Sequence, residues 1–294
     1  MRTREMREFQ ACFRVRVAVM ALTRFDAMGE NHASMFKFFK DLAGHRDLLV
    51  LLMGRNLKIR YKSSALGFFW SLLVPLFMIV LYAVFLRVMK FEMALESLVT
   101  GIIVWQFLAM CLGDSLYAVV GNANLVTKAS FPRSILPLSM VMANFANFLL
   151  ASAVLMVYLV IEPSPFGNPL WLIPALICQS MLCLGVSFFV SACNVFFRDT
   201  EHILSTLMLA WFFMSPIIYP IEMVTASSHL PAWVSVAYFL NPMTGIVSAY
   251  RMTLIGAPNP GTEFLSLSFV VAIVIGLLGM WMFMHLEDRF GDEL

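Results

Sequence analysis

Charged residues are scarce in this chain. Lys, Arg, Asp and Glu make up 13% of its 294 residues, whereas soluble globular domains average about a quarter. Hydrophobic residues account for 61%. Because a single water-soluble domain of this size could not bury so much apolar surface, the composition excludes that class and indicates a protein embedded in a lipid bilayer.

Cysteine is also sparse, and its spacing is irregular. An odd number of scattered cysteines predicts neither a disulfide framework nor a metal cluster. We interpret these residues as small apolar packing groups. The five positions are Cys12, Cys111, Cys178, Cys183 and Cys193.

The signatures of common catalytic sites are missing. The chain has no DxD, HExxH or GxSxG motif, and a phosphate-binding GxxxxGK[ST] loop is excluded because no Gly directly precedes a Lys. Asp114 is almost alone as an ionisable residue within the apolar runs. It is either a functional carboxylate or a group satisfied by a hydrogen bond, with Tyr117 one turn further on. We expect neither an enzyme nor a proton-coupled carrier, and no cofactor or metal bound by this chain.

Long stretches without Asp, Glu, Lys or Arg are abundant, in contrast. They cover residues 63–86, 97–113, 134–161, 163–197, 202–221 and 264–286. About 20 apolar residues cross the hydrocarbon core as a helix. The runs therefore predict six transmembrane helices, at about 66–89, 98–120, 137–161, 171–193, 203–220 and 264–285, in a membrane domain covering 63–294.

Charge is distributed unevenly along the chain. Residues 1–66 hold 13 Lys or Arg and 6 Asp or Glu, whereas the remainder holds 7 and 12. The positive-inside rule places the N-terminus in the cytoplasm, and six spans return the C-terminus to the same side. Residues 1–34 are interpreted either as a disordered cytoplasmic extension or as sequence upstream of a start at Met28 or Met35.

Residues 35–62 predict an amphipathic helix on the cytoplasmic membrane surface. Leu49, Met53, Leu57 and Tyr61 recur every four residues and share one face. The cations of this segment are expected either to contact anionic head groups or to grip a phosphate-bearing substrate. They are Arg55, Lys58, Arg60 and Lys62.

Two segments are interrupted by proline. Between spans two and three, a short helix near 125–136 is bounded by Pro132 and Pro137 and is either a connector or a contact surface for a soluble partner. Between spans five and six, prolines divide residues 222–262 into pieces too short to cross a bilayer, which predicts re-entrant or interfacial external helices. There we expect an external gate at Asn241, Pro242 and Arg251, although Arg251 could instead anchor to head groups.

The segment from Arg60 to Pro75, RYKSSALGFFWSLLVP, resembles the entry to the first span of type-2 ABC transporter permeases that export polysaccharides such as O-antigen, capsule and teichoic acid. Further similarities follow in order from about residue 36 to the end. They are Phe131-Pro-Arg133 with Pro137, Asn194 to Asp199, Pro216, and Asn241-Pro242.

The resemblance implies an all-α integral membrane protein, in which 35–62 is the family's amphipathic interface helix and 222–262 its external gate helices. It implies a homodimer in the bacterial inner membrane with two ABC ATP-binding subunits, which hold the ATP and Mg²⁺. The substrate is expected to be a lipid-linked glycan on a polyprenyl diphosphate, and no nucleic-acid partner is expected. The helix near 125–136 would couple to the ATPase through Lys128, Phe131, Pro132 and Arg133.

Aromatic residues in spans one and five would line the translocation path, because aromatic faces suit sugar rings. They are Trp70, Tyr82, Trp211, Phe212 and Tyr219. Each could equally pack in the protein or face lipid. Two other functions remain open, namely an exporter of a small drug or lipid from the same family and a membrane-embedded glycan-modifying transferase. The latter requires catalytic acids that the sequence lacks.

Overall fold

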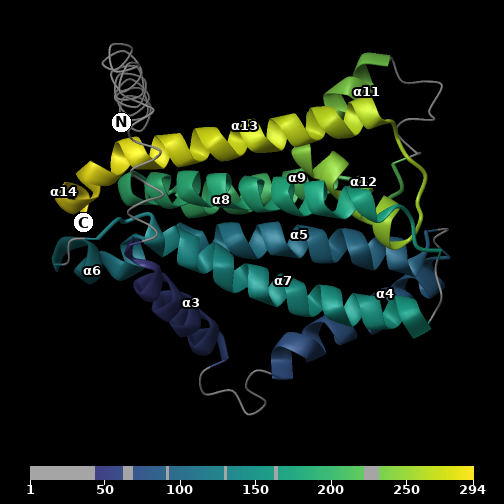
Figure 1. Ribbon diagram of the computed structural model, residues 1–294, viewed down its shortest axis with the longest axis horizontal. Helices are drawn as coiled ribbons and strands as arrows, with labels where there is room; N and C mark the ends of the chain where they lie inside the picture. The colour runs from purple at the N-terminus through teal and green to yellow at the C-terminus, as the bar shows by residue number, and fades with distance from the viewer. Residues whose placement is uncertain (1–43, 62–68, 91–92, 129–130, 162–164, 222–231) are drawn as a thin grey trace, which may run out of the picture. The chain divides into compact units, whose positions relative to one another are not determined.

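The computed structural model describes residues 44–61, 69–90, 93–128, 131–161, 165–221 and 232–294, and these residues form helices and no strand (Figure 1). The chain divides into units 1–46 and 47–294, and the second contains the bundle described below. The predicted extension 1–34 and Lys62 lie outside the described residues. In chain order the helices are α3 (Arg46–Tyr61), α4 (Trp70–Met89), α5 (Leu95–Leu116), η3 (Val120–Asn122), α6 (Ala123–Lys128), α7 (Ile135–Ile161), η4 (Pro169–Trp171), α8 (Leu172–Phe196), α9 (Thr200–Phe213), α11 (Ala232–Phe239), α12 (Pro242–Leu254), α13 (Thr262–Leu286), η5 (Glu287–Arg289) and α14 (Phe290–Glu293).

Four helical segments are long and apolar enough to cross a membrane. They are α5, α7, η4 with α8, and α13 with its C-terminal extension, and they coincide with the second, third, fourth and sixth predicted spans. The first predicted span corresponds to α4, whose apolar part is shorter, Leu73–Val88. The fifth corresponds to α9, which ends at Phe213 rather than 220. Pro216 explains the early end, because proline cannot continue the helical hydrogen bonding and disfavours helical geometry in the residue before it.

The centre of the bundle is the pair α8 and α13, the most extensive helix contact in this unit. Glycines allow the two backbones to touch. A Cβ at Gly279 would lie 2.0 Å from the carbonyl oxygen of Gly185, and a Cβ at Gly185 would lie 2.3 Å from the Cα of Gly276. Small residues serve this purpose in membrane helix packing generally. Figure 1 shows α5 following α8 as the next layer.

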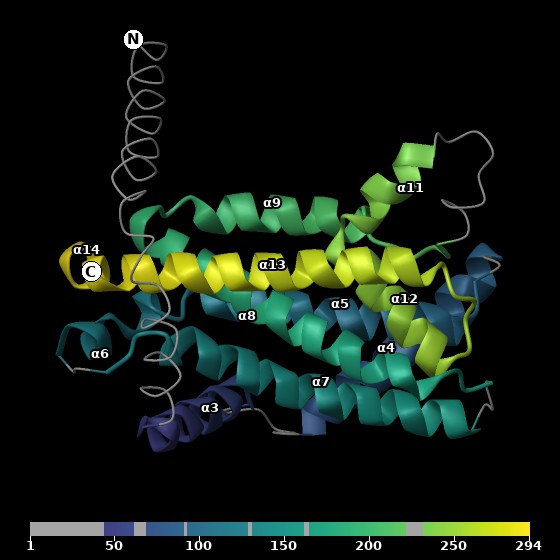
Figure 2. The same cartoon turned by 45° about the horizontal axis from the view of Figure 1, so that its top comes forward.

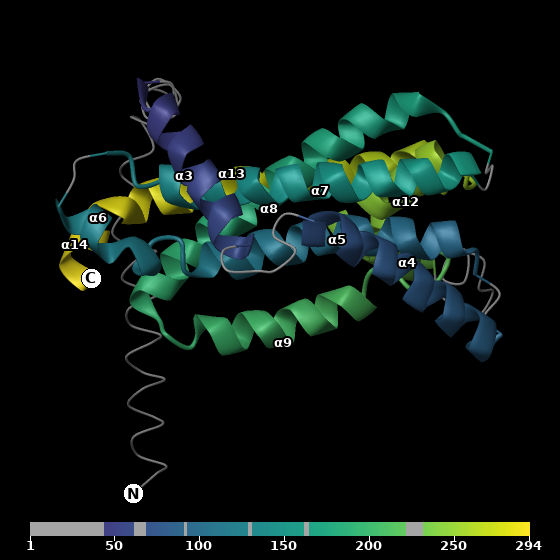
Figure 3. The ribbon, with the colours of Figure 1, turned by 90° about the horizontal axis from the view of Figure 1, so that it is seen from below.

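Two helices flank α5. Helix α4 packs on α5 and α7, whereas α9 packs on α5 and α8. Figure 3 shows α9 on one side of α5 and α7 on the other. None of the residues within α9 is buried, and Phe77 and Val88 of α4 are 68% exposed. Exposed apolar faces of this kind suit a lipid or protein neighbour.

The proline-rich segment after α9 contains the two short helices that the sequence predicts. Asn241 caps α12, because its side-chain oxygen accepts a hydrogen bond from the Met243 amide at 3.1 Å, and Pro242 occupies the first helical position. Helix α12 is buried from Pro242 to Thr253. With 13 residues it is too short to cross a bilayer.

The helices α3, α6 and α14 lie at one end of the bundle (left in Figure 2). We call it the basic end after the cations of α3 and α6, which are Arg55, Lys58, Arg60 and Lys128. The short helix predicted near 125–136 is observed as α6 and stops at Lys128, so Phe131, Pro132 and Arg133 belong to the turn that follows. The break expected at Pro137 does not occur. That residue lies in the first turn of α7, where backbone N–H groups have no intrahelical partner and proline is tolerated.

Candidate functional site

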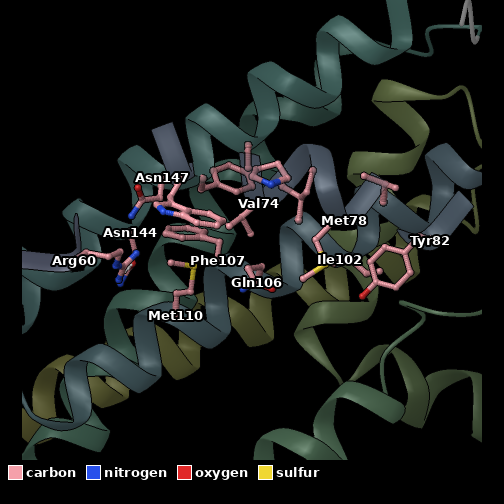
Figure 4. Close-up of a pocket in the computed structure, with 16 residues that line it drawn as sticks. Arg60, Val74, Met78, Tyr82, Ile102, Gln106, Phe107, Met110, Asn144 and Asn147 are labelled. Carbon is pink, nitrogen blue, oxygen red and sulfur yellow. Dashed lines mark hydrogen bonds between the residues drawn. The ribbon is translucent and has the colours of Figure 1, made fainter. Parts of the chain in front are cut away.

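A cavity of about 340 Å³ opens between the end of α3 and the helices α4, α5 and α7 (Figure 4). Its walls are mostly apolar. Trp70 and Tyr82, both predicted to line a translocation path, contribute to them. The polar side chains that reach the cavity are Arg60, Gln106, Asn144 and Asn147. We call this space the α4–α7 cavity.

Arg60 joins three helices at one end of this cavity. Its Nη2 atom donates hydrogen bonds to the Asp114 carboxylate on α5 and, at 2.9 Å, to Oδ1 of Asn144 on α7. Asn144 Nδ2 donates to the same Asp114 oxygen at 2.7 Å. The Arg60 and Asp114 side chains are 27% and 37% exposed, so solvent and lipid head groups screen part of their attraction. Asp114 is therefore a hydrogen-bonded group, and its partner is Arg60 rather than Tyr117.

Helix α3 makes two further polar contacts with the bundle. Arg55 Nη2 donates to Oδ1 of Asn122 at 2.9 Å, and Asn56 Nδ2 donates to Oγ of Ser139 at 3.0 Å. Arg55 and Arg60 therefore bind protein groups, and Lys58 is exposed. The expected contacts of these cations with head groups stay a prediction. The repeat of apolar residues identified the helix, but it could not show which cations had partners within the bundle.

A second hollow, of about 470 Å³, lies between α5 and α9. The Tyr117 hydroxyl donates a hydrogen bond across it to the Glu201 carboxylate, which raises the pKa of Tyr117 above its ordinary value. Phe212 also lines it, and its ring lies 5.5 Å from that of Trp105. The predicted path residues are therefore divided between two sides of α5, with Trp70 and Tyr82 on one and Phe212 on the other.

Trp211 and Tyr219 hold the turn after α9. Trp211 Nε1 donates to Oδ1 of Asn241 at 2.8 Å, and Asn241 Nδ2 donates to Oγ of Ser215 at 2.9 Å. The Tyr219 hydroxyl donates to the Phe213 carbonyl at 3.0 Å and also bonds to the Tyr238 hydroxyl. The polar atoms of both aromatic side chains therefore connect the end of α9 with α11 and α12.

Arg251 is buried, with 5% of its surface exposed. Its Nε atom donates to the Ser97 carbonyl at 3.0 Å and its Nη2 atom to the Ile217 carbonyl at 2.8 Å. Gly101 leaves room for the guanidinium, because a Cβ there would lie 2.9 Å from Nη2. The head-group alternative for Arg251 is thus wrong. A charged group at membrane depth is costly unless the protein satisfies it, and here backbone carbonyls do so.

The turn after α6 is attached to the C-terminal segment. Arg133 Nη1 donates a hydrogen bond to the Glu287 carbonyl, whereas Lys128 is exposed. Phe290 is fully buried and packs against Phe196 and Phe283 at ring distances of 5.9 and 5.3 Å. No sequence pattern predicts the hydrogen bond between Arg133 and Glu287, which lie 154 residues apart.

A buried polar bridge between three helices was not predicted from the sequence. Gln179 on α8 donates to the Val104 carbonyl of α5 at 2.9 Å and accepts a hydrogen bond from the Tyr250 hydroxyl of α12 at 2.7 Å. A glutamine within a long apolar run was the available signal. Among the described residues, no group of three or more His, Cys, Asp or Glu side chains is placed to hold a metal ion.

These features define a multi-pass α-helical membrane protein that satisfies its polar groups between helices. Residues 47–255 match the family model described as ABC-2 type transporter. The chain belongs to that family and is a transport permease.

Similar proteins of two organisms are named O-antigen export system permease protein RfbA. Two from Klebsiella pneumoniae are 34% and 33% identical over 254 residues, which is 84% of this chain and 95% of each relative. One from Myxococcus xanthus is 30% identical over 268 residues, which is 88% of this chain and 100% of the relative.

Proposed function

We propose that this chain is the permease subunit of an ATP-driven ABC exporter that moves a lipid-linked polysaccharide of the O-antigen type across the bacterial inner membrane. The observation that carries the proposal is the similarity to O-antigen export permeases along nearly their full length. Two copies of the chain form the pathway, and two separate ABC subunits hydrolyse ATP.

In this arrangement the basic end faces the cytoplasm and both termini lie on that side. The excess of Lys and Arg before residue 67 supports this orientation. Helices α4 and α9 serve as the first and fifth of six spans, and α11 and α12 form the re-entrant external gate helices. Because α9 has 14 residues, the turn that follows it completes the crossing, and Arg251 satisfies carbonyls of that turn.

Movement begins where the ATPase subunits contact α6. Closure of these subunits around ATP displaces α6, which continues into α5 through η3. Helix α5 carries α9 with it at the cytoplasmic end through Tyr117 and Glu201. Since none of the residues within α9 is buried, α9 can shift at a smaller cost than α8 or α13. The α4 and α9 helices of the two copies then separate around the glycan.

Deletion of the gene tests this function. Surface polysaccharide should disappear, and lipid-linked glycan should accumulate at the cytoplasmic face. The wild-type gene should restore export, but not when the ATPase partner carries an inactivated nucleotide site. Unchanged surface polysaccharide together with increased sensitivity to a small toxic compound would instead indicate a drug exporter of the same family.

A further inference from the structure

Among its described lining residues, the α4–α7 cavity has its one cation and both asparagines at one end, and its other walls are mostly apolar, apart from the Gln106 amide and the Tyr82 hydroxyl. Figure 4 shows Arg60, Asn144 and Asn147 gathered at one end, with Tyr82 at the other and Ile102 and Phe107 between them. A few polar groups at one end of an apolar space fit a ligand with a polar group on an apolar chain. A free sugar or an inorganic ion would leave most of these walls without a matching surface.

Arg60 retains hydrogen-bonding capacity at the polar end. A guanidinium carries five N–H donors, and both bonds of Arg60 use the Nη2 atom. Within the part of the chain that the structure describes, its Nε and Nη1 atoms donate to no protein group. Asp114 and Asn144 thus hold the Nη2 atom, and with respect to the described residues Nε and Nη1 remain for an oxygen-rich anion such as phosphate.

The cavity also reaches the outer surface of the bundle. Trp70 and Val74 line the cavity, yet their side chains are 45% and 44% exposed. The adjoining surface of α4 is apolar, with Phe77 at 68% exposure and Val80 at 60%. In the single chain, a ligand with an apolar chain can therefore enter sideways past α4 and leave part of that chain along this helix.

Charge narrows the choice of ligand. The carboxylate of Asp114 lies directly on Arg60 and offsets its positive charge. The carboxylate would repel a multiply charged diphosphate. The described lining residues include no second cation that would offset this repulsion. A phosphodiester carries a single negative charge and still presents two oxygens to the guanidinium, so it fits the pair better.

We propose that the α4–α7 cavity binds a glycerophospholipid of the surrounding bilayer. The phosphodiester contacts Arg60 and Asn147, and the first part of one acyl chain lies against Met78 and Phe107. This site goes beyond the proposed function, because it holds a component of the membrane rather than the exported glycan. An occupied cavity fills the space between α4 and α5 and fixes α4, one of the helices proposed to separate during export.

Native mass spectrometry of the full-length chain in micelles doped with phosphatidylglycerol tests the site. We expect retention of one lipid per chain, and retention at least about tenfold lower for diacylglycerol, which lacks the phosphate. Arg60→Gln should lower phosphatidylglycerol retention by a similar factor. Lys58→Gln is the matched control, because it removes an exposed cation from the same helix and should have no effect.

A second pair of variants keeps the Arg60–Asp114 contact intact, in case Arg60→Gln disturbs folding. Ala151→Phe fills the apolar part of the cavity and should abolish lipid retention. Ala153→Phe places the same ring on the exposed side of α7 and should leave lipid retention unchanged.

Equal retention of diacylglycerol and phosphatidylglycerol, or unchanged lipid retention in Ala151→Phe, would overturn the proposal. Displacement by inorganic phosphate would show an anion site without lipid selectivity, and displacement by an equimolar polyprenyl diphosphate would assign the cavity to the export substrate. Either result would overturn it too.

Discussion

Asp114 and Tyr117 lie three residues apart at the end of α5, but their side chains bind neighbours on different sides of that helix. Asp114 accepts hydrogen bonds from Arg60 of α3 and Asn144 of α7, and Tyr117 donates to Glu201 of α9. Both contacts lie at the basic end, directly before η3 and α6. Helix α5 thus connects η3 and α6 with the flanking helices, and the proposed displacement of α6 would reach them through it.

Tyr117→Phe should loosen the attachment of α9. The phenol contributes one hydrogen bond to a carboxylate at an exposed site, so we expect a small loss of stability and a clear local effect. Hydrogen exchange followed by mass spectrometry should show faster exchange for residues 200–213 and no change for α13. Ser205→Ala is the control, because among the described residues that exposed hydroxyl bonds only to a carbonyl of its own helix. Equal exchange in Tyr117→Phe and wild type would mean that the bond does not restrain α9.

The same contact should depend on pH in a defined direction. Tyrosine must be protonated to donate to Glu201, and this bond raises the pKa of Tyr117 above the ordinary value of about 10. The stabilisation is therefore fully present below that ordinary value and is lost as the pH rises through the raised pKa. The difference in thermal midpoint between wild type and Tyr117→Phe should stay constant from about pH 7 to pH 9 and shrink at higher pH. A difference that shrinks already below about pH 8 would exclude the phenol as its source.

Gly279→Ala should destabilise the bundle. The added Cβ would lie 2.0 Å from the Gly185 carbonyl oxygen, so α8 and α13 must move apart along their shared surface. Overpacking of this kind costs about 1–3 kcal/mol, and we expect a lower thermal midpoint in micelles. Gly113→Ala is the matched control, because among the described residues no atom beyond its own stretch of helix lies within 4 Å of the added Cβ. It should be neutral or stabilising by up to about 1 kcal/mol, and a similar fall in both variants would contradict the role of the close helix contact.

Arg251→Met should be strongly destabilising. Methionine keeps much of the side-chain length but leaves the carbonyls of Ser97 and Ile217 without this donor. Hydrogen bonds from a charged group contribute about 1.5–3 kcal/mol each, and we expect a loss of about 3 kcal/mol in thermal or denaturant unfolding. Arg251→Lys should recover only part of the lost stability at most, because one ammonium group cannot reproduce the planar arrangement of donors in the guanidinium. Arg289→Met, at an exposed site, should have little effect.

The sequence predicted those parts of the fold that depend on the length of apolar runs. Helices α5, α7, α8 and α13 were predicted because a long apolar segment in lipid must satisfy its backbone internally. The end of α9 was predicted too far along the chain, although Pro216 gave the signal for it. Apolar periodicity also predicted the helical part of 35–62.

Contacts between distant side chains could not be predicted in the same way. Arg60 and Asp114 are separated by 54 residues, and no local pattern connects a cation in the last turn of an amphipathic helix with a carboxylate in a span. The family resemblance implies an ATPase contact for Arg133, which stays a prediction, but it does not indicate the hydrogen bond from this guanidinium to the Glu287 carbonyl. Such pairs depend on how helices pack, and packing is decided by shape along the whole contact rather than by spacing in one segment.

Lys128 is the clearest test of the proposed ATPase contact at α6. Its side chain is exposed at the end of that helix, so charge reversal should leave the bundle intact and change only the surface offered to the partner. We expect Lys128→Glu to weaken binding of the ATP-binding subunit by about tenfold in detergent pull-down or titration experiments. The thermal midpoint of the permease alone should not change. Lys90→Glu reverses another exposed charge, which follows α4 at the opposite end of the bundle, and should bind the partner normally.

Arg133→Met separates direct contact from support of the turn. Because Arg133 holds the Glu287 carbonyl, its loss should first increase hydrogen exchange in residues 287–294, and partner binding should weaken as a consequence. Lys128→Glu should weaken binding without changing that exchange. If both variants bind the ATP-binding subunit as wild type does, α6 and the turn after it do not form the coupling surface, and the route from the partner to α5 must begin elsewhere at the basic end.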